Sequence, residues 1–178
     1  FFCMGGNFIS ATPDTIATAE GLNRVRLTVQ VSTKLNRSHL VTGKTALILP
    51  CLGRTELDIQ NNERQFVTVE NSMGIVHTSK GSLKPVSINL KSEPWIIAAI
   101  AEATLGDKRD WMKLVSDYDN IRSLMSKALA GFENYNERVR GPTGFALPNP
   151  PRDSRTFTTH DKKAHFITHN LPDVTIPE

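Results

Sequence analysis

The chain has 178 residues, of which 39% are hydrophobic, and its formal net charge is +3. This length and composition are enough to bury the core of one ordinary domain. The positive charge is scattered and forms no basic stripe between aromatic residues, so we expect no nucleic acid as a partner. The sequence shows no signal-peptide pattern and no apolar run near the roughly 18 residues of a membrane span, so we expect no membrane span.

The first expected element is a short apolar strand that runs into Gly5-Gly6-Asn7. Glycines at the carboxyl end of a strand let an anion or a nucleotide approach the main chain, and the Asn7 amide adds a donor and an acceptor. Thr12 to Asp14 then predict a helix N-cap, a helix-starting proline and an acidic first turn, for a helix that runs to about Leu22. This order is typical of a nucleotide-binding βαβ unit, although an ordinary strand-to-helix turn has the same local pattern.

Two further strands are expected, at Arg26 to Val31 and at Thr45 to Leu49. The second is a continuous apolar run, which is typical of a fully buried strand. Asn36 to Val41 leaves room between them for only a short helix. Short strands that alternate with helices indicate a parallel sheet, which binds ligands beyond the carboxyl ends of its strands. We therefore expect an α/β fold, with a three-layer Rossmann-like domain and a mainly parallel sheet over residues 1–131.

After the third strand the pattern becomes a long polar excursion with two extended segments, at Gln65 to Glu70 and at Ile75 to Ser79. Loops of this length in a compact domain are usually functional or brace a neighbour. Apolar residues then recur with helical spacing, which predicts helices over residues 92–106, 107–115 and 118–130.

The composition shifts after Gly131 to Asn, Arg, Gly and Pro, which predicts a linker over residues 132–154. Arg155 to Thr159 and Ala164 to Thr168 then predict a hairpin. A lone hairpin is marginal in water, so we expect it to belong to a sheet that is incomplete in this chain. Together with the apolar start, this pattern favours an internal fragment of a longer protein.

The motifs of self-contained enzymes, such as GxSxG, HExxH, a Walker lysine loop and a complete GxGxxG, are absent from the sequence. Cys3 and Cys51 lie far apart and neither belongs to a CxxC pair, so we interpret them as buried thiols of a cytoplasmic protein. His160, His165 and His169 lie on the expected exposed hairpin without an accompanying acid cluster, so we assign no metal ligand.

Charged and hydroxyl side chains stand where a ligand is expected. The loop Arg54 to Asp58 follows the third strand, and its charges either bind a nucleotide or pair with one another. Glu93 is either a first-turn acid of its helix or a ligand contact. Ser32 and Thr33 end the second strand, where a dinucleotide site often has an acid for the ribose, and no acid is present.

Taken in order, these segments resemble the large subunit of molybdopterin oxidoreductases, particularly its formate-dehydrogenase-like branch. The tail is similar to the start of that family's C-terminal β-barrel domain, to which we assign residues 155–178. The resemblance rests on Met4-Gly5-Gly6-Asn7, Val29 to Thr33, Ile48 to Cys51, Arg54 to Asp58, Ser92 to Trp95 and, in the tail, Phe157 to Phe166.

The resemblance implies an α/β domain that cradles one of two molybdopterin guanine dinucleotides, the cofactor that carries molybdenum. It implies that Gly6 and Asn7 approach the dinucleotide. It also implies that Ser32 and Thr33 face the guanosine end, and that Glu93 supplies a further polar contact. An iron-sulfur cluster and the metal-ligating Cys or selenocysteine are expected in the parent protein outside this stretch, so we assign no catalytic residue to this chain. The implied partners are the remaining domains of the parent subunit and its small-molecule substrate.

Our leading hypothesis is therefore a cofactor-binding fragment of a cytoplasmic, formate-dehydrogenase-like enzyme that is inactive in isolation. Two alternatives remain open. One is a Rossmann-like module that binds a free nucleotide such as NAD, against which the missing third glycine and the missing ribose acid weigh. The other is a purely structural or interaction domain, which the long excursion and the polar tail would suit.

Overall fold

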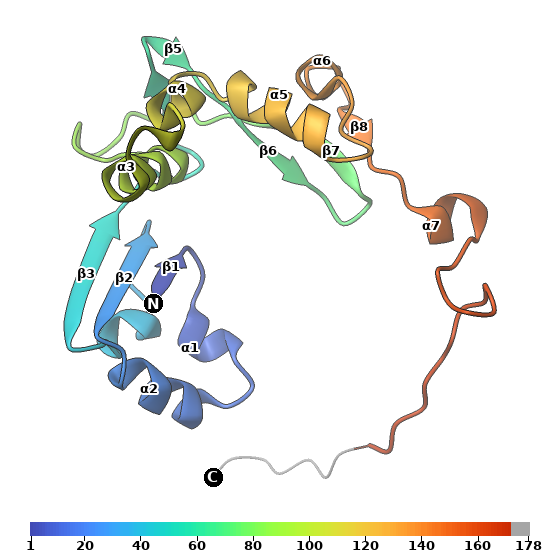
Figure 1. Ribbon diagram of the computed structural model, residues 1–178, viewed down its shortest axis with the longest axis horizontal. Coiled ribbons are helices and arrows are strands. Elements are labelled where there is room, and N and C mark those ends of the chain that lie inside the picture. The colour runs from blue at the N-terminus through green and yellow to red at the C-terminus, as the bar shows by residue number, and fades with distance from the viewer. Residues whose placement is uncertain (172–178) are drawn as a thin grey trace.

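A computed structural model describes residues 1–171 of the chain, and its amino-terminal part is built on a parallel sheet in the order β1-β2-β3 (Figure 1). Met4 pairs with Val31, and Ser32 pairs with Pro50, so the carboxyl ends of the strands lie at one edge. The predicted α/β class and the mainly parallel sheet are confirmed. The elements are β1 (Phe2–Met4), α1 (Phe8–Ala11), α2 (Thr15–Asn23), β2 (Leu27–Ser32), the 3-10 helix η1 (Arg37–Leu40) and β3 (Thr45–Pro50).

The first connection differs from the predicted single helix that starts at Thr12. Thr12 is the C-cap of α1, and its hydroxyl donates to the carbonyl oxygen of Ile9 at 3.1 Å. Asp14 is the N-cap of α2 and accepts a hydrogen bond from the amide of Ala17 at 2.9 Å. The Thr12 prediction is wrong because that hydroxyl closes the preceding turn, which leaves the Asp14 carboxylate to cap the helix.

Strand β3 is less buried than predicted. Leu47 is 48% exposed and Ile48 is 44% exposed, whereas Val31 in the central strand is 1% exposed. Among residues 1–171, β3 is an outer strand of the sheet and pairs with β2 alone. The prediction of a fully buried strand is wrong because an apolar run shows that a strand has apolar side chains to bury, and does not show whether another element packs against them.

The excursion after β3 folds into antiparallel pairs. Both predicted extended segments are confirmed, as β6 (Val67–Glu70) and β7 (Ile75–Ser79), which pair with each other. A smaller hairpin of β4 (Ile59–Gln60) and β5 (Glu63–Arg64) was not predicted. Its two turn residues, Asn61 and Asn62, have φ of 48° and 64°, as a turn of type I′ requires.

The three predicted helices are present, with the middle one starting later than expected. Ser92 caps α3 by accepting from the amide of Trp95 at 3.4 Å, and Gly106, at a φ of 65°, ends it. Asp110 caps α4 by accepting from the amide of Lys113 at 2.9 Å. None of the helices within residues 1–171 is long and apolar enough to cross a membrane. The helices of this region are α3 (Glu93–Leu105), η2 (Gly106–Lys108), α4 (Trp111–Ser116) and α5 (Asp119–Ala128).

Part of the segment assigned to a linker belongs to a buried core. Tyr135, Val139 and Phe145 pack with Val76 of β7, and the rings of Tyr135 and Phe145 meet edge to face with centroids 5.4 Å apart. Strand β8 also pairs with β7. The ordered part of the chain therefore continues well past Gly131, through α6 (Tyr135–Val139), β8 (Phe145–Ala146) and α7 (Pro150–Ser154).

The hairpin predicted in the tail is absent, because no strand forms over residues 155–171. Only a turn remains at its centre, where the amide of Lys162 donates to the carbonyl oxygen of Thr159 at 3.1 Å. Phe166 is 94% exposed. The prediction is wrong because two short strands without a covering surface bury too little apolar area to offset the entropy of ordering them. Residues 172–178, which were assigned to the same β-barrel start, lie outside the described residues.

Tyr118 joins three separate parts of the fold at a position that is 3% exposed. Its hydroxyl donates to Asp58 Oδ2 at 2.5 Å and lies 2.6 Å from Ser92 Oγ, at the start of α3. Its amide donates to Gln65 Oε1 at 2.9 Å, just before β6. The loop after β3, helix α3 and the β6-β7 hairpin are thus held together by one side chain and its backbone.

We predict that Tyr118→Phe lowers the free energy of unfolding by about 1–3 kcal/mol, because Asp58 and Ser92 lose a buried partner. Urea unfolding followed by tryptophan fluorescence measures this loss. Tyr135→Phe is the matched control, since it removes one hydrogen bond, to the uncharged hydroxyl of Thr68, and none to a carboxylate. A smaller loss for Tyr118→Phe than for Tyr135→Phe would contradict the central role of Tyr118.

Candidate functional site

Four chain segments lie next to one another at the carboxyl edge of the parallel sheet (Figure 1). The amide of Gly5 donates to Val31 O at 2.9 Å, and the amide of Cys51 donates to Ser32 O at 3.2 Å. The segment before α3 extends this row, because the amide of Leu52 donates to Lys91 O at 2.9 Å. The fold therefore gathers the residues after β1, β2 and β3 and the start of α3 at one edge, where such sheets bind ligands.

The glycines after β1 are required by the backbone. Gly5 and Gly6 have φ of 67° and 72°, in a region that residues other than glycine rarely adopt. A Cβ atom on Gly5 would lie 3.7 Å from Glu93 Oε1, so the end of β1 meets the first turn of α3. A Cβ atom on Gly6 would meet nothing within 4 Å, which leaves its backbone open to a ligand.

Asn7 is held by the segment around η1. Its side-chain oxygen accepts from Ser38 Oγ at 3.1 Å, while Asn36 Nδ2 donates to the carbonyl oxygen of Gly6 at 2.8 Å. Ser38 is buried, and its own carbonyl oxygen accepts from Gln30 Nε2 at 2.7 Å. The Asn7 oxygen is therefore used inside the fold, which leaves the amide nitrogen as the donor of this side chain.

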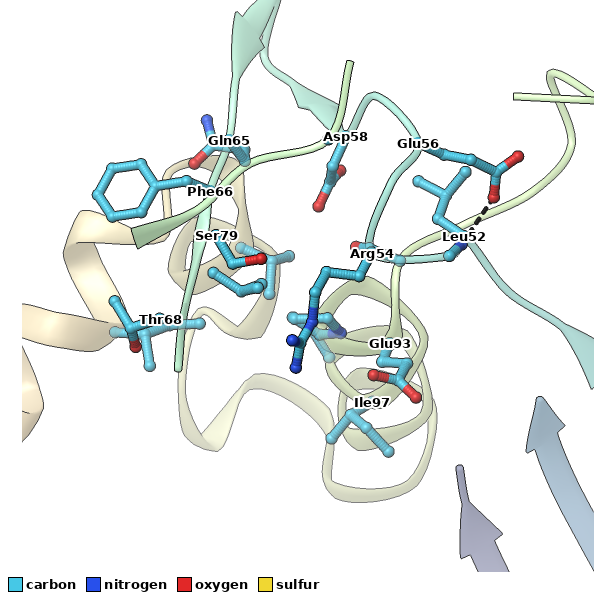
Figure 2. A pocket seen from close by; sticks show the side chains of 18 of the residues that line it. Leu52, Arg54, Glu56, Asp58, Gln65, Phe66, Thr68, Ser79, Glu93 and Ile97 are labelled. Carbon is cyan, nitrogen blue, oxygen red and sulfur yellow. Dashed lines mark hydrogen bonds between the residues drawn. The ribbon is translucent and has the colours of Figure 1, made fainter. Parts of the chain in front are cut away.

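A pocket of about 840 Å³ lies beside this edge. Thr33 and Glu93 line it, together with Arg54, whose side chain extends into the space among the lining residues (Figure 2). Gly6, Asn7 and Ser32 lie at the sheet edge and not in the pocket lining. Other lining residues, for which the sequence indicated no ligand-binding role, include Met4, Gln65, Thr68, Ser79, Ile97 and Val115.

In the loop Arg54 to Asp58, the structure shows whether the charged side chains pair with one another. Glu56 Oε2 accepts from the amide of Gly53 at 2.7 Å, and Asp58 accepts from Tyr118 and from Gln60. Among residues 1–171, Arg54 forms no salt bridge with either acid. Pairing within the loop is therefore not what holds these charges, and the Arg54 guanidinium is available to an anion in the pocket.

Ser32 is less available than Thr33. Its hydroxyl donates to the carbonyl oxygen of Lys34 at 2.7 Å, which fixes the turn after β2. Thr33 is exposed and lines the pocket. Of these two predicted residues, Thr33 is the one that lines the cavity, and the Ser32 hydroxyl shapes the turn that leads into it.

The hydrogen-bonded group of Asp58, Tyr118 and Ser92 lies next to the pocket, and Asp58 and Ser92 are part of its lining. Burial raises the pKa of Tyr118 well above its ordinary value, and the hydrogen bond to Asp58 raises it further. Tyr118 therefore stays protonated and keeps donating to Asp58 at physiological pH. This hydrogen-bonded group could not be predicted from the sequence, because Asp58, Ser92 and Tyr118 are far apart along the chain.

Cys51 is a buried thiol, as expected from the sequence, whereas Cys3, for which the same was expected, is only partly buried. Cys51 is 3% exposed, and burial, with the nearby carboxylates of Glu93 and Glu56, raises its pKa to about 11. Because the thiolate is the reactive form of cysteine, this environment favours the unreactive, protonated thiol near neutral pH.

No protein-family model matches the chain. The chain is 52% identical to a protein of Mycobacterium tuberculosis (strain ATCC 25618 / H37Rv) named uncharacterized oxidoreductase, in an alignment that covers 99% of this chain and 23% of the relative. A protein of Mycobacterium bovis with the same description matches equally well. Protein YdeP of Escherichia coli (strain K12) is 49% identical over 93% of this chain and 22% of its own length. The chain is thus related to proteins described as oxidoreductases and spans less than a quarter of their length.

We predict that Cys51 reacts with iodoacetamide far more slowly in the folded chain than in urea at about pH 8, because burial keeps it protonated. The rate should rise as the pH approaches 11, where the thiolate forms. Mass spectrometry of a Cys3→Ser variant isolates the reaction of Cys51. Equal rates for the folded and unfolded chain at the lower pH would contradict the assignment.

Proposed function

We propose that this chain is a cofactor-binding module of a molybdenum-dependent oxidoreductase of the formate-dehydrogenase-like type, and that it holds part of a molybdopterin guanine dinucleotide. The observation that carries the proposal is the pocket of about 840 Å³ at the carboxyl edge of the parallel sheet, with Arg54, Thr33 and Glu93 in its lining. The relation to proteins described as oxidoreductases supports the redox class. The cofactor would supply the redox chemistry, and the module would bind and orient it.

The residues at this edge fit the chemistry of a guanine dinucleotide. The diphosphate is an anion, for which the Arg54 guanidinium is a strong and directional partner. Ribose hydroxyls can bond to the Thr33 hydroxyl, and the donors of the guanine edge can bond to the Glu93 carboxylate. The positive φ of Gly6 and the space around it leave the main chain open to a large ligand, which the Asn7 amide nitrogen can also reach.

Cofactor retention in the full-length parent protein tests this proposal. We predict that Arg54→Gln weakens cofactor binding by about tenfold, because one charge-assisted contact is lost. The variant should therefore hold less guanine nucleotide and less molybdenum per protein. Elemental analysis measures molybdenum, and chromatography of the nucleotide released by denaturation measures guanine. Arg26→Gln is the matched control, because Arg26 precedes β2 at the opposite edge of the sheet.

Three outcomes separate the proposal from its alternatives. Equal retention by the Arg54→Gln, Arg26→Gln and unmodified proteins would contradict binding at this pocket. A parent protein that never holds molybdenum or guanine nucleotide, but binds NAD in a calorimetric titration, would favour the free-nucleotide module. Formate-dependent dye reduction by the molybdenum-loaded parent tests the formate-dehydrogenase-like branch, and its absence with full cofactor content would point to another substrate.

A further inference from the structure

We propose that His160, Asp161 and His165 form a binding site for a divalent transition-metal ion such as Zn²⁺ on the surface of the tail. One ligand atom from each of the three residues lies within 4.8 Å of the others. Zinc binds imidazole nitrogen and carboxylate oxygen at about 2.0–2.2 Å, so ligand atoms around one ion lie about 3–4 Å apart. Because all three side chains are exposed, small rotations can close the remaining gap.

A local turn brings the three ligands together. Asp161 Oδ1 accepts from the amide of Lys163 at 3.1 Å, and Thr159 Oγ1 donates to the carbonyl oxygen of Lys163 at 2.7 Å. Lys162 has a φ of 60°, in the left-handed region, which reverses the chain between the histidines. This turn depends on contacts within residues 159–165, so the site does not require the missing strands of the predicted hairpin.

The two imidazoles lie close together. The rings of His160 and His165 meet edge to face with centroids 5.4 Å apart, and His165 Nε2 lies 2.8 Å from Asp161 Oδ1. A metal ion would replace the hydrogen bond between His165 and Asp161 with two coordinate bonds. No metal was assigned to these histidines from the sequence because no acid cluster accompanies them, whereas in the structure the single carboxylate of Asp161 lies beside His165.

The ligand set selects the kind of metal ion. Two imidazole nitrogens and one carboxylate oxygen suit Zn²⁺, Co²⁺ and Ni²⁺, whereas Mg²⁺ and Ca²⁺ prefer oxygen ligands alone. Three protein ligands leave open coordination positions for water. The positive charges of Lys162 and Lys163 in the same turn oppose binding, so their replacement by Gln should strengthen it.

A Co²⁺ titration of the 178-residue chain, followed by visible absorption, and a Zn²⁺ titration by calorimetry test the site. We expect one ion per chain. His160→Ala, His165→Ala and Asp161→Asn should each weaken binding by about tenfold or more, since each removes one of three ligands. His169→Ala is the matched control from the same tail, because it leaves the three ligands intact, and it should bind like the unmodified chain.

Limited trypsin digestion gives a second measurement. The peptide bonds after Lys162 and Lys163 lie between the ligands, so Zn²⁺ should slow cleavage there in the unmodified chain and not in the His165→Ala variant. Equal Zn²⁺ affinity for the unmodified chain and a His160→Ala/His165→Ala variant would overturn the proposal, as would an equal loss in His169→Ala. The result is independent of cofactor binding at the pocket, which lies in a different part of the chain.

Discussion

The hydroxyl of Tyr118 is the constraint on which the arrangement of the pocket depends. It sits between the carboxylate of Asp58 and the hydroxyl of Ser92, and both of these residues also line the pocket. Because Ser92 is the N-cap of α3, the same contact fixes where that helix begins and so where Glu93 lies. The desolvation cost of burying these polar groups is offset by the hydrogen bonds among them. Because those bonds need this one geometry, they make the arrangement specific as well as stable.

A second constraint is the meeting of β1 with α3. The positive φ of Gly5 turns the chain directly after the strand, and the missing side chain lets this turn come close to Glu93. The parallel pairing of Cys51 with Lys91 brings the start of α3 to the same edge. An edge built in this way presents backbone groups and a few polar side chains to a ligand, while the apolar side chains of Val31, Cys51 and Ile96 stay in the core beneath it.

The sequence predicted most of the elements but not how they are covered. The helix at Ser92 and the strands β1 to β3 were predicted because caps, glycines and apolar periods are local signals. The exposure of Leu47 and the core around Tyr135 were not, since both depend on partners distant in sequence. In the site, the pocket lining includes Thr33 and Glu93, which the resemblance implied as cofactor contacts, whereas the role of Ser38 in holding Asn7 had no sequence signal.

By itself, the sequence determined the α/β class, the succession of the parallel strands β1, β2 and β3 and the edge where polar residues gather, because these follow from side-chain periodicity and from where glycine and proline permit a turn. Only the tertiary structure decided that Arg54 stays unpaired with its neighbouring acids in the described chain, that Tyr118 joins Asp58 to Ser92, and that the ligand atoms of His160, Asp161 and His165 come within 4.8 Å of one another. Hydrogen-bond partners are set by distances in space, and the chain brings them together only when its elements pack.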